Sequence, residues 1–404
     1  MDRYLNRIGG ILTENKHKAK AIVVTAGVIA GLVMTMSAPA FSGEIKSREE
    51  WKKEYVRPAE VPFPVDNPYT AAKADLGRTL FFDPRLSGSN YISCGTCHNP
   101  SLAWGDGLPK GIGHAMTVLG RRTPTILNLA WAEQLMWDGR FDTLEEQVLG
   151  PMSAPVEMNQ QMEAIVTELR SIPEYQTLFK VSFGEEGITI PNIAKAIATF
   201  ERTIVSGIAP FDRWVAGDEA AISEKAKRGF DLFNNKANCV ACHSGWNFTD
   251  DSFHDIGISD TDIGRGKELP GVAVMQHAFK VPTLRNVVER APYMHDGSAK
   301  NLFSVVAHYN NGFVKRPSLS SEIYELNLTD SEQADLVAFM KTLSSNDAPV
   351  AFPKLPAYDQ TLAGSVSGTN PAAGEGSDMR GPENAVAAEP QTCGGFFQHW
   401  LLCK

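Results

Sequence analysis

The chain has few cysteines, few basic residues and almost no apolar sequence long enough to cross a membrane. After residue 36, no apolar run approaches the roughly 20 residues that a membrane-spanning helix requires, so no span is predicted in the body of the protein. The 404 residues include 38 Lys and Arg against 47 Asp and Glu, a formal net charge of −9. This acidic balance argues against nucleic acid as a partner. It fits either the attraction of a basic protein or a surface charged for solubility.

The single long apolar run, residues 21–36, lies near the N-terminus and has the pattern of a secretory signal. Three lysines between positions 16 and 20 precede it, and Ala38-Pro39-Ala40 follows as a cleavage pattern. As a helix it would be roughly 24 Å long, less than the hydrocarbon core of about 30 Å. We expect cleavage after Ala40 and export to the periplasm, with no membrane span left. An uncleaved anchor is the alternative. The remaining chain would carry 33 basic and 45 acidic side chains.

Only six cysteines occur, and four of them form two copies of one motif. The copies are Cys94-Gly95-Thr96-Cys97-His98 and Cys239-Val240-Ala241-Cys242-His243. Two thiols at this spacing can both form thioethers with one porphyrin, and the histidine directly after them is placed to bind the iron. A redox-active thiol pair or half of a zinc site would need no histidine at that position. The sequence therefore predicts two covalently bound c-type haems, with His98 and His243 as proximal ligands.

The other two cysteines, Cys393 and Cys403, lie in a C-terminal tail of different composition. Residues 353–392 are rich in Pro, Gly, Ala and Ser and are predicted to be a disordered linker. A disulfide that closes the loop 393–403 would suit an oxidising compartment. The alternative is that the apolar residues of this loop dock onto a partner.

Helical patterns occupy the chain between the signal and the tail. Asn67 followed by Pro68 indicates the start of a helix before the first motif, and Ser223 that of a helix before the second. Thr329-Asp330-Ser331-Glu332 is a capping box. Apolar residues spaced between positions 193 and 204 indicate another long helix, and residues 207–217 are the expected domain junction. These patterns alone predict an exported helical protein with two haems.

Five further strings resemble the bacterial dihaem cytochrome c peroxidase and MauG family, in the family's order between about residues 68 and 345. They are Trp137-Asp138-Gly139-Arg140, Pro155-Val156-Glu157-Met158, Ser252-Phe253-His254-Asp255-Ile256-Gly257, Pro282-Thr283-Leu284-Arg285-Asn286 and Ala291-Pro292-Tyr293-Met294-His295-Asp296-Gly297. The resemblance implies an all-α fold of two cytochrome c-like domains in series, with a peroxidatic haem in the first and an electron-transfer haem in the second. The expected divisions are a signal peptide 1–40, an N-terminal domain 41–215, a C-terminal domain 216–352 and a tail 353–404.

The resemblance also implies roles for residues near the first haem. His98 would bind the iron on one face and leave the other face open to hydrogen peroxide. Glu157 matches the family's acid-base position, where a carboxylate can move a proton between the two peroxide oxygens. Trp137 matches a tryptophan that relays an electron between the haems, and Gln147 and Pro151 match positions in the distal pocket. The alternatives are a solvated surface glutamate and an ordinary core tryptophan.

The remaining ligand of the second haem separates the subfamilies. The position that holds methionine in the cytochrome-oxidising peroxidases is Tyr309 in this chain, and MauG also has a tyrosine there. A phenolate ligand would lower the reduction potential of this haem and let it store an oxidising equivalent. Competing ligands are His308, Met275 and Met294, and an open site is a further alternative.

Two residues depart from a simple match to MauG. His114 lies ten residues before Pro124, as does the removable distal histidine of the reductively activated peroxidases. It is equally consistent with a solvent-facing loop histidine. Arg122 stands where the family commonly has an asparagine that helps to bind an interdomain calcium ion. Because a guanidinium group cannot ligate a cation, calcium is a doubtful cofactor.

The leading hypothesis is a periplasmic dihaem peroxidase that reduces hydrogen peroxide to water with electrons from a small cytochrome c or cupredoxin. The alternative is a MauG-like enzyme that uses peroxide to oxidise side chains of a partner protein. A third hypothesis is a dihaem electron carrier without peroxidase turnover. Glu157 and the lack of a certain sixth ligand at the first haem argue against the third.

Overall fold

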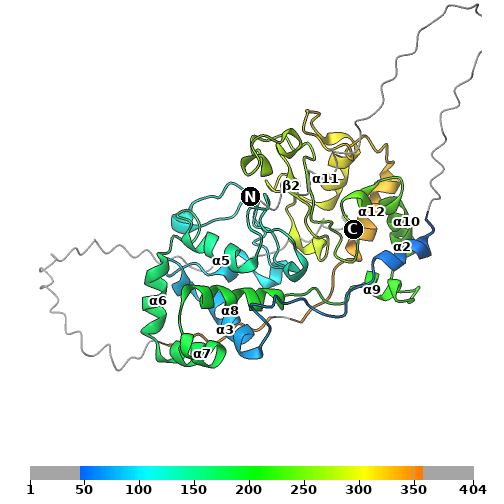
Figure 1. Ribbon diagram of the computed structural model, residues 1–404. Helices are drawn as coiled ribbons and strands as arrows, with labels where there is room; N and C mark the ends of the chain where they lie inside the picture. Colours follow the sequence, from blue (N-terminus) through cyan, green and yellow to red (C-terminus); the bar gives the residue numbers. More distant parts are fainter. Residues whose placement is uncertain (1–45, 349, 358–404) are drawn as a thin grey trace, which may run out of the picture. The chain divides into compact units, whose positions relative to one another are not determined.

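The computed structural model describes residues 46–348 and 350–357, and their regular structure is mostly helical (Figure 1). The predicted signal peptide and the pair Cys393 and Cys403 lie outside these residues. No helix in the described ranges is long and apolar enough to cross a membrane. The α-helices are α2 (Arg48–Glu54), α3 (Ala71–Phe81), α4 (Cys94–Cys97), α5 (Leu144–Ser153), α6 (Met162–Arg170), α7 (Pro173–Phe183), α8 (Ile190–Arg202), α9 (Pro210–Val215), α10 (Glu224–Asn234), α11 (Leu302–Ala307) and α12 (Asp330–Lys341).

Short elements connect these helices. Strands β1 (Phe253–His254) and β2 (Phe279–Lys280) pair antiparallel. A π-helical turn, η10 (His308–Gly312), continues α11. The 3-10 helices are η1 (Pro84–Leu86), η2 (Pro100–Leu102), η3 (His114–Met116), η4 (Leu129–Trp131), η5 (Gly184–Glu186), η6 (Cys239–Ala241), η7 (Arg265–Lys267), η8 (Ala273–Met275) and η9 (Val287–Arg290).

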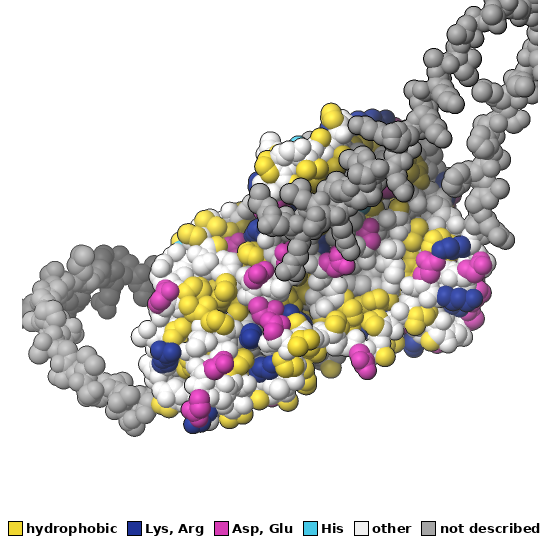
Figure 2. Space-filling view, viewed as in Figure 1, with side chains coloured by type: hydrophobic (Ala, Val, Ile, Leu, Met, Phe, Trp, Pro, Cys, Tyr) yellow, Lys and Arg dark blue, Asp and Glu magenta, His cyan; other side chains and the backbone are white. Residues whose placement is uncertain are grey.

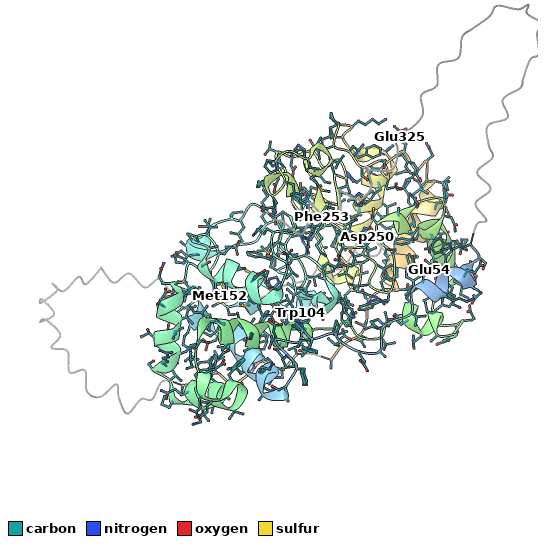
Figure 3. The ribbon with its side chains drawn as sticks, in the orientation of Figure 1. Glu54, Trp104, Met152, Asp250, Phe253 and Glu325 are labelled. Carbon is teal, nitrogen blue, oxygen red and sulfur yellow. The ribbon has the colours of Figure 1, made fainter. Side chains whose placement is uncertain are left out.

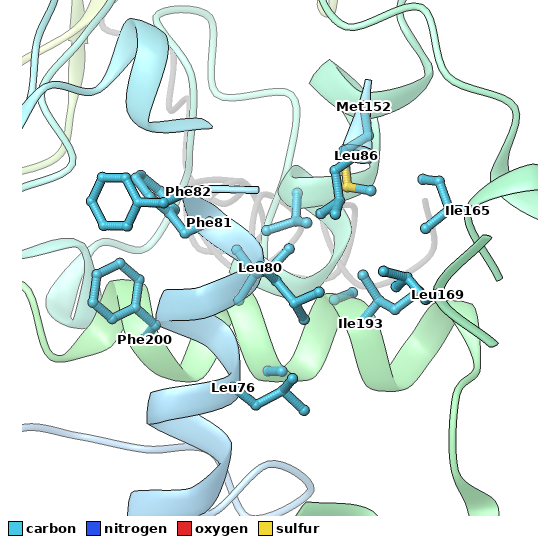
Figure 4. Packing of buried hydrophobic residues seen from close by; sticks show 14 of the residues in the cluster. Leu76, Leu80, Phe81, Phe82, Leu86, Met152, Ile165, Leu169, Ile193 and Phe200 are labelled. Atoms are coloured by element: carbon cyan, nitrogen blue, oxygen red, sulfur yellow. The ribbon is translucent and has the colours of Figure 1, made fainter. Parts of the chain in front are cut away.

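One hydrophobic core forms where α3 packs against α8 (Figure 4). Buried side chains of both helices fill it, among them Leu80 of α3. At the crossing, Gly77 lies so close to α8 that a Cβ atom would come within 1.9 Å of the Ala196 carbonyl oxygen. A larger residue would therefore force the helices apart. The crossing also brings the Phe81 ring near the His98 ring, with 6.5 Å between centroids, so this helix pair supports the first cysteine motif.

A second core repeats this arrangement around α10 and α12. A Cβ atom on Gly229 of α10 would lie 2.0 Å from the Asp335 carbonyl oxygen of α12. Helices α2 and α9 pack on the same core. The Tyr55 hydroxyl, just after α2, donates to Asn234 Oδ1 at 2.6 Å. The segment that begins the predicted N-terminal domain thus contributes to the core of the C-terminal half.

The predicted helix starts at Ser223 and Thr329 are confirmed, and the one at Asn67 is wrong. Ser223 caps α10, and Thr329 forms a capping box at α12. Helix α3 begins three residues later than Asn67-Pro68 indicated, and its N-cap is Thr70. The reason is that the Asn67 side chain is buried and donates to Glu145 Oε1 at 2.7 Å, so it is not available as a cap.

One carboxyl in α8 is buried with an oxygen atom that lacks a hydrogen-bond partner among the described residues. Glu201 is 5% exposed, and its Oε2 atom has no hydrogen-bond partner in the described part of the chain. Burial raises the pKa of Glu201 to about 8, although Arg202 opposes the shift. Between its ordinary pKa and this raised value, the folded protein binds one proton more than the unfolded chain does. This group therefore makes the protein less stable as the pH rises through that interval.

The substitution Glu201→Gln should flatten the dependence of stability on pH, because glutamine keeps the shape of the side chain and cannot ionise. We expect a higher thermal midpoint than that of the unsubstituted protein at pH 8, with a smaller difference at pH 5. Circular dichroism of the haem-loaded protein at both pH values measures this. The exposed residue Glu163 supplies a matched control, E163Q. Identical pH profiles for E201Q and the unsubstituted protein would show that folding does not shift the pKa of this carboxyl.

Candidate active site between two cysteine motifs

Both cysteine motifs line a single cavity of about 840 Å³. Helix α4 carries the first motif and η6 begins the second. Trp104 and Asp250, which follow the two motifs in the chain, are labelled in Figure 3. None of the four motif cysteines forms a disulfide with another described residue, so all four sulfur atoms are available to bind a cofactor. Burial raises the pKa of Cys97 to about 11 and those of Cys239 and Cys242 to about 12, so these thiols are neutral at physiological pH.

The two motif histidines are oriented in the same way. The Nδ1 atom of His98 lies 3.1 Å from the Trp104 carbonyl oxygen, and that of His243 lies 2.9 Å from the Phe248 carbonyl oxygen. Because a carbonyl only accepts, each Nδ1 carries the proton and each Nε2 keeps a lone pair for a metal. Burial lowers the pKa of both imidazoles, which keeps them in the neutral form that binds iron.

Buried arginines supply further evidence that the cavity fits haem. Arg122 and Arg290 are each 5% exposed, and both line the cavity. The Nε atom of each has no hydrogen-bond partner among the described residues. Buried cations require compensating charge, and the carboxylates of a haem in this cavity would provide it. With the thiols and the neutral imidazoles, the residues present fit two c-type haems.

The two sides of the cavity are built from an internal repeat, in which residues 122–151 correspond to residues 280–309. Leu135 pairs with Phe141 in an isolated antiparallel bridge, and Tyr293 pairs with Ala299 in the same way. Helices α5 and α11 begin at equivalent positions. Three equivalent pairs share a positive φ: Asn128 and Asn286, Met136 and Met294, and Gly139 and Gly297.

This repeat aligns Pro151 with Tyr309 and Trp137 with His295. All four residues line the cavity. Tyr309 offers a phenol oxygen that can bind iron, whereas the ring of Pro151 has no donor or acceptor atom. The same scaffold therefore presents a phenol oxygen on one side of the cavity and no such atom at the equivalent position on the other.

Glu157 lines the cavity on the side of the first motif. Glu157 follows α5 in a turn that packs against Gly113. A Cβ atom added to Gly113 would lie 2.0 Å from the Val156 carbonyl oxygen, so the turn approaches the Gly113 backbone closely. Burial raises the pKa of Glu157, and Arg140, which also lines the cavity, opposes this. A carboxyl whose pKa is raised toward neutrality in a cavity suits acid-base chemistry.

Gln147 and Trp137 also line this cavity. The Gln147 amide donates to Met136 Sδ at 3.4 Å. The Trp137 indole N–H donates to the Arg122 carbonyl oxygen at 2.8 Å, and its ring meets that of His295 edge-on with 6.3 Å between centroids. A backbone carbonyl accepts this hydrogen bond but is too weak a base to take the proton itself. An electron passing through Trp137 would therefore leave the N–H in place.

Tyr309 lies in the π-helical turn η10 and packs against the C-terminal core. Its hydroxyl has no hydrogen-bond partner in the part of the chain that the structure describes. Burial is the main cause that raises its pKa, and Cys242 and Cys239 add to the shift. The phenol is thus neutral until a cation such as iron replaces its proton. Single π-helical turns of this kind often mark functional positions.

The structure separates the competing ligands. His308 Nε2 lies 2.8 Å from the Ile256 carbonyl oxygen and does not line the cavity. Met294 lines it, whereas Met275 does not. His114 is also outside the lining residues, and its Nε2 lies 3.2 Å from Asn159 Nδ2. The role of His114 as an iron ligand remains a prediction.

His295 was not predicted from the sequence. It is 3% exposed, stacks on Phe279 at 3.5 Å between centroids, and its Nε2 lies 2.5 Å from Asp260 Oδ2. The internal repeat is the signal that reveals it, because Trp137-Asp138-Gly139 and His295-Asp296-Gly297 occupy equivalent places after two copies of Pro-Thr-x-x-Asn.

Comparisons with known proteins agree with this site. Residues 71–220 match the family described as di-haem cytochrome c peroxidase, and residues 226–344 match cytochrome c. The chain is 50% identical over 344 residues to the methylamine utilization protein MauG of Methylorubrum extorquens, covering 84% of this chain and 97% of that protein. It is 36% identical over 301 residues to the cytochrome c551 peroxidase of Nitrosomonas europaea, covering 73% and 86%. A solved MauG-like protein associated with microbial copper homeostasis has a TM-score of 0.66 at 32% identity, covering 72% and 94%.

The chain therefore belongs to the dihaem cytochrome c peroxidase and MauG family. Its two cytochrome c-type domains follow one another in series and carry two covalently bound haem c groups. It is an oxidoreductase of the di-haem peroxidase type. These conclusions confirm the predicted fold class, cofactors and enzyme class.

The substitution Glu157→Gln tests the acid-base role. The variant should keep both haem spectra and react with hydrogen peroxide about 10² to 10⁴ times more slowly, the usual effect of losing a positioned proton-transfer group. In the unsubstituted protein the rate should fall as the pH drops through the raised pKa of Glu157, because the protonated carboxyl cannot accept a proton. E157Q should lack this decrease. Stopped-flow mixing across pH measures both effects, with the exposed residue Glu133 as a control (E133Q). An unchanged rate would remove Glu157 from the mechanism.

Proposed function

We propose that this protein uses hydrogen peroxide to oxidise side chains of a partner protein, and that it does so in the periplasm. The observation that carries the proposal is Tyr309, a cavity-lining phenol without a hydrogen-bond partner in the described ranges. The relationship to MauG, at 50% identity over most of both chains, supports the same reading. This is the alternative that the sequence raised, and it has better support than the leading hypothesis.

Reduction of hydrogen peroxide to two waters consumes two electrons and two protons, and in this proposal the electrons come from the partner's side chains. The bound haems supply the redox chemistry. Glu157 would move a proton from one peroxide oxygen to the other, and its partly buried position keeps that proton from bulk water. Pro151 would leave space for peroxide beside the first haem.

Trp137 would pass electrons between the two haem sites. Its N–H is fixed by the Arg122 carbonyl and its ring by the edge-on contact with His295. Tyr309 would be the second ligand of the haem held by His243. Because a phenolate places negative charge on the iron, this haem would hold oxidising equivalents until the partner protein is in place.

The second candidate is a peroxidase that takes electrons from a small cytochrome c or cupredoxin. Its support is the 36% identity to a cytochrome c551 peroxidase and the acidic net charge of the chain. On the face in Figure 2, however, acidic and basic side chains are interspersed, so this face has no extended field of one sign to steer a basic donor. The lower identity and the tyrosine at position 309 make this candidate the weaker one.

Variants of Tyr309 distinguish the two functions. Tyr309→Phe should leave the second haem without its phenolate, so the two oxidising equivalents taken from peroxide should no longer persist in the protein. Tyr309→Met should raise the reduction potential of that haem and speed the oxidation of a small cytochrome c. Potentiometric and peroxide titrations followed by optical spectroscopy measure both. Tyr91, which is 86% exposed, supplies the control Y91F. A second haem that already has a high potential and a sulfur ligand in the unsubstituted protein would exclude the proposal.

A further inference from the structure

Arg122 joins the two haem-binding halves of the molecule. Its backbone N–H donates to the His295 carbonyl oxygen at 2.8 Å. Its guanidinium Nη2 donates to the Arg290 carbonyl oxygen, and its own carbonyl accepts the Trp137 indole N–H at 2.8 Å. One residue thus fixes the loops that carry Trp137 and His295, which face each other at the cavity.

The charge of Arg122 is balanced only in part, by the nearby carboxylate of Asp106, which forms no ion pair with it. Within residues 46–348 and 350–357, no Asp or Glu lies at ion-pair distance from its guanidinium group. Arg290 lies close by and carries like charge. Burial and the nearby Arg122 lower the pKa of Arg290 to about 9, and burial likewise lowers the pKa of Arg122. The Arg122 guanidinium is therefore held here by the Arg290 carbonyl oxygen, by the longer-range attraction of Asp106 and by whatever anion occupies the cavity.

Of the two equivalent residues in the repeat, Arg122 and Lys280, only Arg122 has a side chain that crosses to the other half. Lys280 occupies the position of Arg122 in the C-terminal half, and its backbone N–H donates to the Trp137 carbonyl oxygen at 2.8 Å. Its ammonium group pairs with Asp251 in its own half. The Arg122 side chain instead crosses the boundary and binds a carbonyl, the type of oxygen ligand that calcium uses.

We propose that the Arg122 guanidinium is the interdomain cation of this protein and takes the place of a calcium ion. The resemblance to the family associates calcium with this position, and the residues present do not fit it. A guanidinium group has only hydrogen-bond donors, so it cannot ligate calcium. The Arg122 guanidinium also donates to the Arg290 carbonyl oxygen, an oxygen of the type that calcium would bind. Arg122 is thus a positioning residue for Trp137, and the protein needs no calcium to arrange its two haem sites. This inference does not rest on the identity of the oxidised substrate.

The first test uses the unsubstituted, haem-loaded protein. Elemental analysis after purification in calcium-containing buffer should find no stoichiometric calcium. Dialysis against EGTA should change neither the optical and EPR spectra nor the thermal midpoint. One calcium ion per chain, whose removal alters the haem spectra and whose return restores them, would overturn the proposal. Neither readout depends on catalytic turnover.

The second test compares variants at position 122. Arg122→Asn removes the guanidinium and offers an amide oxygen, so it should lower the thermal midpoint by roughly 5 °C, slow electron exchange between the haems and make both respond to added calcium. Arg122→Lys keeps the charge and should recover much of the exchange rate. The control R228N removes an arginine that pairs with Asp335 between α10 and α12 and does not contact the haem cavity. If R122N matches R228N in interhaem exchange and ignores calcium, Arg122 is not the interdomain cation. If R122N fails to fold, the metal analysis of the unsubstituted protein still decides the question.

Discussion

Two backbone hydrogen bonds across the boundary between the haem-binding halves determine how the rest of the site is arranged. Arg122 donates to the carbonyl of His295, and Lys280 donates to the carbonyl of Trp137, each at 2.8 Å. The two bonds are equivalent in the internal repeat. They place one aromatic ring from each half next to the other, in the cavity that both cysteine motifs line. Arg121 strengthens the boundary through ion pairs to residues on both sides of it, Asp138 and Asp262.

The internal repeat explains how one scaffold can serve two different haems. Each half crosses a pair of helices at a glycine, orients its motif histidine with a backbone carbonyl and sends a capped helix toward the cavity. The difference lies in single side chains at equivalent places. Pro151 has no ligand atom where Tyr309 has a phenol, and Trp137 has an indole where His295 pairs with Asp260. We infer that the asymmetry of the chemistry comes from these positions and not from the fold.

Local sequence patterns predicted the parts of this structure that depend on neighbouring residues. The cysteine motifs, the caps at Ser223 and Thr329 and the helical fold class belong to this group. The features that these local patterns did not predict depend on contacts between distant residues. Asn67 does not cap a helix because its side chain is bound by Glu145. Helix α2 packs on the C-terminal core, and His295 became visible as a site residue only through its place in the repeat.

We expect one haem to have an open face and the other to have both faces occupied. EPR spectroscopy of the fully oxidised protein, without added reductant, distinguishes these two states of the iron. The expected result is equal amounts of one high-spin and one low-spin ferric haem, and a reaction with peroxide that needs no prior reduction. Two low-spin haems, together with a peroxide reaction that begins only after one-electron reduction, would contradict it and would assign the missing ligand to His114.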